Sequence, residues 1–70
     1  MIRFRKELWA QLVQLVRNDR QQRPTWDGNL ISKTARTRLV RAGLADQHKG
    51  YNFPTLDGIR MYNIFAATET

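Results

Sequence analysis

Apolar residues recur at helical spacing near the start of the chain. The stripe, with steps of three and four residues, consists of Phe4, Leu8, Leu12, Leu15 and Val16. Such steps place side chains on one face of an α-helix, so the pattern predicts an amphipathic helix over about residues 3–17. Trp9 and Val13 lie beside the stripe and widen its apolar surface, which suggests a second contact.

The segment from residue 18 to residue 31 interrupts this pattern. Polar residues lead to Pro24, which restricts its predecessor and cannot donate a backbone hydrogen bond, so the first helix should end before it. Asp27 and Gly28 favour a turn, because glycine readily adopts a positive φ. Trp26 is expected to fill part of the core. The pattern leaves open whether residues 18–31 form a helix, a strand or a loop.

A second helix is predicted over about residues 33–42. The Ser32 hydroxyl can cap its N-terminus, and Gly43 can end it in a left-handed conformation. The apolar face of this helix carries Ala35, Leu39 and Ala42. The opposite face is polar and basic, and it consists of Lys33, Thr34, Thr37, Arg38 and Arg41. Arg36 lies nearer the flank and is expected to be a plain surface residue.

A β-hairpin and a third helix complete the pattern. Two short runs, at about residues 44–48 and 51–55, flank the turn-forming pair Lys49 and Gly50. In the second run Tyr51, Asn52 and Phe53 alternate, so one face of that strand should be aromatic. Thr55 can cap a last helix over about residues 56–66. These elements predict one α+β domain over residues 1–70.

The order of elements in residues 32–66 resembles the second half of winged helix-turn-helix DNA-binding domains. Residues 39–44, Leu-Val-Arg-Ala-Gly-Leu, match the corner after the recognition helix, and residues 55–58, Thr-Leu-Asp-Gly, match the return into the final helix. The family has a further short helix before the recognition helix, for which residues 18–31 offer no candidate. That element is therefore a loop or short strand here, or the helix-turn-helix is incomplete. The size and reduced form also resemble small phage or prophage proteins.

The resemblance implies a regulator of transcription that binds double-stranded DNA. The helix at 33–42 would enter the major groove, and the hairpin would form the wing. The residues so placed on DNA are Lys33, Thr34, Thr37, Arg38 and Arg41 from the helix and His48 and Lys49 from the wing. Arg38 and Arg41 are the expected base readers, because arginine pairs in bidentate fashion with guanine. The alternative is a solvated surface, since any helix needs a polar side.

Net charge favours an anionic partner for the chain. Twelve Lys and Arg against six Asp and Glu give a formal charge of +6, and most of the basic residues are arginines. The chain has no cysteine, which fits a reducing, cytoplasmic setting. The basic residues at the start of the chain are followed by no uncharged apolar run, so neither a signal peptide nor a membrane span is expected.

The titratable residues indicate a binding protein and not an enzyme. One His, no Cys and six scattered acids assemble no catalytic group or metal site, and the singly dispersed glycines form no phosphate-binding loop. No cofactor, metal or small-molecule ligand is therefore predicted.

Apolar residues on the first and last helices suggest a protein partner. The surface that would form a homodimer consists of Trp9, Val13, Met61, Ile64 and Phe65. A rival interpretation is a protein-interaction module of winged-helix shape that docks a larger partner through these helices and meets an acidic surface with its basic face. A further option is stacking of single-stranded bases on Trp9, Trp26, Tyr51 and Phe53, although aromatics in a tiny domain more often form its core.

Overall fold

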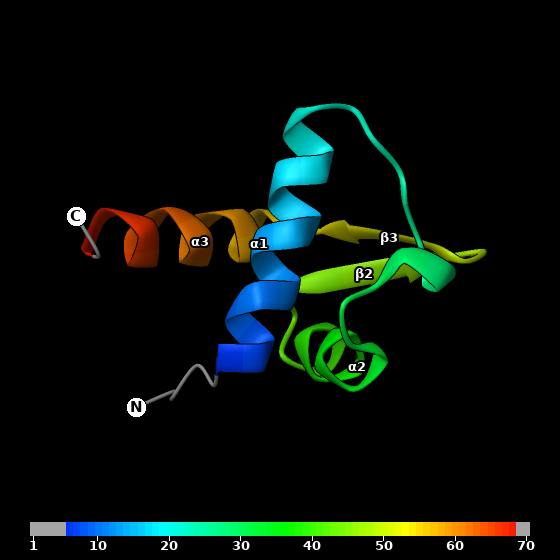
Figure 1. Ribbon diagram of the computed structural model, residues 1–70. Coiled ribbons are helices and arrows are strands. Elements are labelled where there is room, and N and C mark those ends of the chain that lie inside the picture. The colour runs from blue at the N-terminus through cyan, green and yellow to red at the C-terminus, as the bar shows by residue number, and fades with distance from the viewer. Residues whose placement is uncertain (1–5, 69–70) are drawn as a thin grey trace.

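The computed structural model describes residues 6–68, which form three α-helices and a three-stranded antiparallel sheet (Figure 1). In chain order the elements are α1 (Lys6–Arg20), β1 (Thr25–Trp26), the 3₁₀ turn η1 (Asp27–Asn29), α2 (Lys33–Arg41), β2 (Ala45–His48), β3 (Tyr51–Pro54) and α3 (Leu56–Thr68). The prediction of a small α+β domain with a winged-helix-like arrangement is confirmed.

The first helix ends later than the sequence predicted. It continues to Arg20 and not to residue 17, while residues 3–5 of the predicted helix lie outside the described residues. Gln22 adopts a φ of 57°, and the amide of Arg23 donates to the carbonyl of Asn18 at 2.7 Å. This left-handed residue closes the helix without a glycine. Pro24 restricts only the residue before it, so it does not set the helix end.

The remaining boundaries lie close to their predicted positions. The second helix and the two hairpin strands agree with the prediction to within one residue at each end, and α3 continues to Thr68 and not to residue 66. Ser32 is the N-cap of α2, and Gly43 follows the helix with a φ of 77°. Lys49 and Gly50 both have positive φ in the hairpin turn, at 50° and 82°.

Residues 18–31, which the sequence left open, contribute the third strand of the sheet. The strand order is β1-β3-β2, so β3 is the central strand. Thr25 lies opposite Asn52, and Trp26 lies opposite Tyr51. The turn η1 and the loop after it occupy the rest of the stretch before α2.

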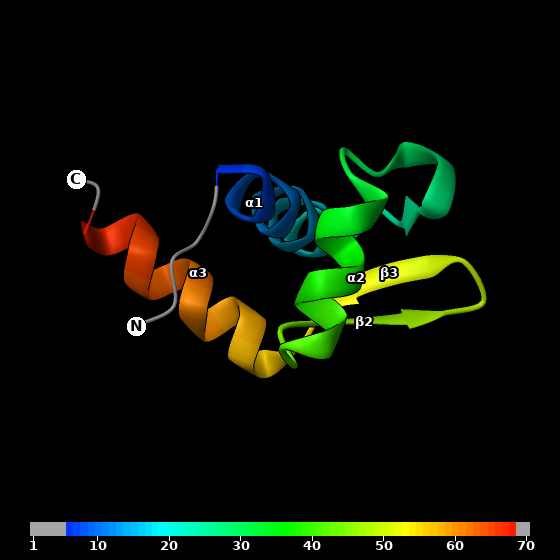
Figure 2. The same cartoon turned by 90° about the horizontal axis from the view of Figure 1, so that it is seen from below.

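The core lies where α1 and α2 meet one another and the sheet. Its buried apolar residues are Leu12, Leu15, Val16, Ala35, Leu39, Leu44 and Ala45. The predicted inner face of α2 is thus confirmed for Ala35 and Leu39, whereas Ala42 is exposed because α2 ends just before it. Seen from below, α3 and the β2–β3 hairpin extend in opposite directions from this centre (Figure 2).

The prediction that Trp26 fills part of the core is wrong, because Trp26 is 49% exposed to solvent. Neighbouring residues of a strand point to opposite faces of a sheet. Thr25 is buried on the helix side of β1, where its hydroxyl accepts a hydrogen bond from Asn18, so Trp26 points to the other side. A strand of two residues was too short for its alternation to be recognised in the sequence.

The corner after α2 packs against the start of α3. The Thr55 hydroxyl donates to the carbonyl of Gly43 at 2.6 Å and accepts from the amide of Gly58 at 3.1 Å, which caps α3. Gly58 is buried, and a Cβ at this position would overlap the carbonyl group of Leu44. The glycine is therefore required by the close approach of two backbones.

We expect Gly58→Ala to destabilise the fold by about 1–3 kcal/mol or more, because the backbone at Leu44 cannot yield as a flexible side chain would. The free energy of unfolding is measured by urea titration. Gly28→Ala is the matched control, since a Cβ at that exposed position meets nothing within 4 Å. Equal stability of the two variants would contradict this account of Gly58.

Candidate nucleic-acid interface

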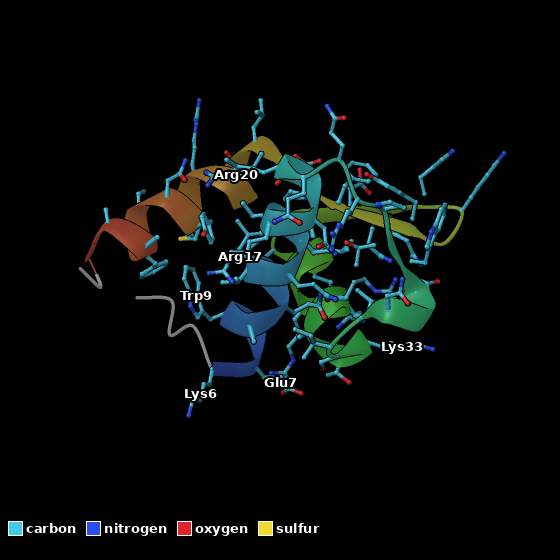
Figure 3. The ribbon with its side chains drawn as sticks, turned by 45° about the horizontal axis from the view of Figure 1, so that its top comes forward. Lys6, Glu7, Trp9, Arg17, Arg20 and Lys33 are labelled. Carbon is cyan, nitrogen blue, oxygen red and sulfur yellow. The ribbon has the colours of Figure 1, made fainter. Side chains whose placement is uncertain are left out.

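The outward face of α2 gathers the helix residues that the sequence predicted for DNA contact. Its members are all exposed and are Lys33, Thr34, Thr37, Arg38 and Arg41. We call these residues the α2 basic face. Lys33 points away from the body of the molecule (Figure 3). The Thr37 hydroxyl donates to the carbonyl of Lys33 at 3.0 Å, so its proton is already used within the helix. The sequence of α2 contains no acidic residue.

Side chains of α1 hold the N-terminus of α2 in place. The Ser32 hydroxyl accepts from the amide of Ala35 at 3.1 Å and donates to Glu7 Oε1 at 3.0 Å. The Ser32 amide donates to Oε1 of Gln11 at 2.9 Å, and Gln11 is fully buried. These contacts fix the orientation of α2 in addition to the apolar packing of its inner face.

Arg36 is not the plain surface residue that the sequence predicted. Its side chain is 14% exposed, and its Nη1 lies 3.0 Å from Oδ1 of Asp27 and 2.8 Å from Oδ1 of Asn52. Asp27 also accepts from Nδ2 of Asn52 at 2.9 Å and from Nε2 of Gln47 at 3.0 and 3.1 Å. We call these four residues the Asp27 network. It neutralises Arg36, which therefore does not belong to the α2 basic face.

Sequence reasoning missed the Asp27 network for a physical reason. The sequence pattern at Asp27 and Gly28 indicates only a turn, and the partners of Asp27 come from α2, β2 and β3. No local pattern indicates which arginine of α2 will turn inward. The one available signal is Asn52, which lies between two aromatic residues of a strand, but the sequence does not show that the Asn52 side of the strand is the buried one.

The two predicted wing residues lie at the end of the hairpin. His48 and Lys49 are exposed, and Lys49 occupies the turn itself. In Figure 2 the hairpin lies beside α2, and its turn extends beyond that helix. The contacts between α2 and β2 agree with this placement, since Gln47 of β2 shares the Asp27 network with Arg36 of α2. The wing residues thus lie on an element that adjoins α2.

The apolar residues predicted for a dimer surface lie where α1 and α3 meet. Trp9, labelled in Figure 3, stacks on Tyr62 with ring centroids 5.6 Å apart and forms an edge-on contact with Phe65 at 6.0 Å. Met61 packs against the core, and Ile64 is 62% exposed. Much of the apolar surface that suggested a partner is therefore covered within one chain.

Three comparisons with known proteins give no family for this chain. No protein-family model, curated protein or solved structure matches it significantly. Within residues 6–68, no three His, Asp or Glu side chains gather in a way that would hold a metal ion. In the same range, each helix is too short or too polar to cross a lipid bilayer. A function for this chain must therefore be inferred from its own sequence and geometry.

Hydrogen bonds from Asn52 lower the pKa of Asp27 below its ordinary value of 3.8, and the charge of Arg36 and the hydrogen bonds of Gln47 and Arg36 act in the same direction. Partial burial raises this pKa but does not prevail. Because the folded-state pKa of Asp27 lies below its unfolded-state pKa, the network stabilises the fold at pH values above the unfolded-state pKa. That contribution is lost as the pH falls through the folded-state pKa.

We expect Asp27→Asn to lower the urea midpoint near neutral pH, because the variant removes the charge that faces Arg36. The difference from the wild type should narrow as the pH falls below about 4, the ordinary pKa of an unfolded Asp, and should vanish once the pH has passed through the lower folded-state pKa of Asp27. Asp19→Asn is the control, since Asp19 is an exposed carboxyl of α1. A difference that stays constant from neutral to acidic pH would show that charge is not the cause.

Proposed function

We propose that this protein binds double-stranded DNA and regulates transcription, with the α2 basic face in the major groove and the hairpin as a wing. One observation carries the proposal. The exposed cations of α2 lie on its outward face, and the helix carries no carboxylate. The remaining arginine of α2, Arg36, is neutralised within the Asp27 network. The resemblance of residues 32–66 to winged helix-turn-helix domains supports the same function.

The dimensions of α2 suit the proposed groove. An α-helix with its side chains is about 10–12 Å across, and the major groove, about 12 Å wide, admits it. The N-terminus of α2 is fixed to α1 through Ser32 and Gln11, so the helix needs little ordering when it binds. Arg38 and Arg41 would read guanine or contact phosphate. Thr37, with its hydroxyl proton engaged, would offer its methyl group to thymine.

We expect the double variant Arg38→Ala, Arg41→Ala to bind a labelled random duplex at least about tenfold more weakly than the wild type. Fluorescence anisotropy at several salt concentrations measures the affinity. If both arginines contact phosphate, the slope of log affinity against log salt should fall by about two, since each contact contributes about 0.9.

A charge-matched control separates a local contact from general attraction. Arg17→Ala, Arg60→Ala also removes two positive charges, but from exposed positions on α1 and α3. This control should retain most of the duplex affinity. Equal losses in the two double variants, or no duplex binding at low salt, would overturn the proposal and favour the interpretation as a protein-interaction module.

We also propose that two chains pair through the outer sides of α1 and α3. The support is Ile64, which is 62% exposed and directly precedes Phe65, the residue whose ring contacts Trp9. Sedimentation equilibrium should give twice the mass of one chain, and Ile64→Glu should return the mass to that of one chain. A wild-type mass that equals one chain at every concentration would exclude the homodimer. A dimer would place two α2 helices for half-sites about one turn of duplex apart.

A further inference from the structure

One face of the sheet carries aromatic rings that the core does not use. In the central strand β3, Asn52 and Pro54 are buried on the side of the helices, while Tyr51 and Phe53 are half-buried on the other side. Trp26 of β1 lies opposite Tyr51 and shares this second side. We call it the outer sheet face. It consists of Trp26, Tyr51 and Phe53, together with the β2 residues paired with them, His48 and Asp46.

The three rings form one continuous group. Trp26 meets Tyr51 edge to face with centroids 5.7 Å apart, and Tyr51 lies 5.4 Å from Phe53 in a tilted arrangement. Trp26 is 49% exposed, so the end of this group is open to a ligand. Tyr51 and Phe53 are alternate residues of a strand, so their Cα atoms lie about 7 Å apart along it. The group thus offers successive aromatic contacts along the middle of the sheet.

The surroundings of the rings favour an anionic ligand. His48 is paired with Tyr51, Lys49 occupies the adjoining turn, and Arg23 is exposed just before β1. Among the described residues of the outer sheet face, Asp46 is the only carboxylate, and its Oδ1 accepts a hydrogen bond from the amide of Gln47 at 2.8 Å. The Asp27 carboxylate is held by the Asp27 network instead.

We infer that the outer sheet face binds a single-stranded nucleic acid by stacking unpaired bases on Trp26, Tyr51 and Phe53. Every base has a π-face, so stacking on aromatic rings recognises unpaired bases with little sequence preference. Paired bases are closed to such stacking, and duplex DNA is therefore not the ligand of this face. The basic side chains at the hairpin turn and before β1 would contact the phosphates.

This site is separate from the α2 basic face. The two surfaces belong to different elements and have no residue in common. The overlap is with the proposed wing, because His48 belongs to the outer sheet face and Lys49 adjoins it. An exposed aromatic face can also receive a protein, but the net charge of +6 and the single carboxylate favour a polyanion over an apolar peptide. The inference therefore does not depend on the proposed duplex binding.

The test measures the affinity of a labelled oligothymidine strand at low salt by fluorescence anisotropy. Trp26→Ala should weaken binding about 5- to 150-fold, the effect expected for one stacked base. Trp26→Phe should retain most of the affinity, because it keeps a ring. Ile31→Ala is the matched control, since Ile31 is also a large exposed apolar residue, at 59%, but lies in the loop before α2.

Tryptophan emission gives a second readout that a purely structural role would not change. The oligonucleotide should quench the wild-type emission through Trp26, and Trp26→Phe should abolish that quenching because Trp9 lies on α1 against Tyr62 of α3, away from the outer sheet face. Unchanged affinity in Trp26→Ala, quenching that persists in Trp26→Phe, or no single-strand binding at low salt would each overturn the inference. Loss of duplex binding in the Arg38, Arg41 double variant, with quenching by the single strand retained, would confirm that the two sites are independent.

Discussion

The Asp27 carboxylate is the point at which the separate parts of this small domain are joined. It belongs to η1 and receives hydrogen bonds from α2, β2 and β3. The partner Arg36 is 14% exposed, and a guanidinium so placed is costly without a nearby anion. The position of α2 relative to the sheet therefore depends on an electrostatic contact as well as on Leu39 in the core.

Polar contacts are prominent because a chain of this length has little apolar surface to bury. Gln11 of α1 is fully buried, and its side-chain amide accepts from the amide of Ser32 and donates to Gln14, also in α1. Gln14 in turn donates to the carbonyl of Asn29. Among the described residues every buried side-chain nitrogen and oxygen has a hydrogen-bond partner. The interior thus combines a compact apolar core with polar contacts at the joints between elements.

The sequence predicted those features that depend on neighbouring residues. Ser32 and Gly43 delimit α2 through local capping, and the hairpin turn at Lys49 needs only its own backbone conformation. The features it missed depend on contacts between distant residues. The strand β1 forms because Thr25 pairs with Asn52 of β3. Arg36 turns inward because its guanidinium forms an ion pair with Asp27. The α2 basic face was therefore predictable as a set of residues, while the exclusion of Arg36 from it was not.

The segment that carries Asp27 also exposes the aromatic face. Thr25 is buried on the helix side of β1, so its neighbour Trp26 points to the other side of the sheet. The turn η1 begins directly after Trp26, and the amide of Asp27 donates to the carbonyl of Gly50 at 3.0 Å. The exposed indole and the carboxylate that contacts Arg36 therefore come from neighbouring residues at the junction of β1 and η1. Contact with Tyr51 offsets part of the lost burial, since an aromatic pair contributes about 0.5–1.5 kcal/mol beyond the area it buries.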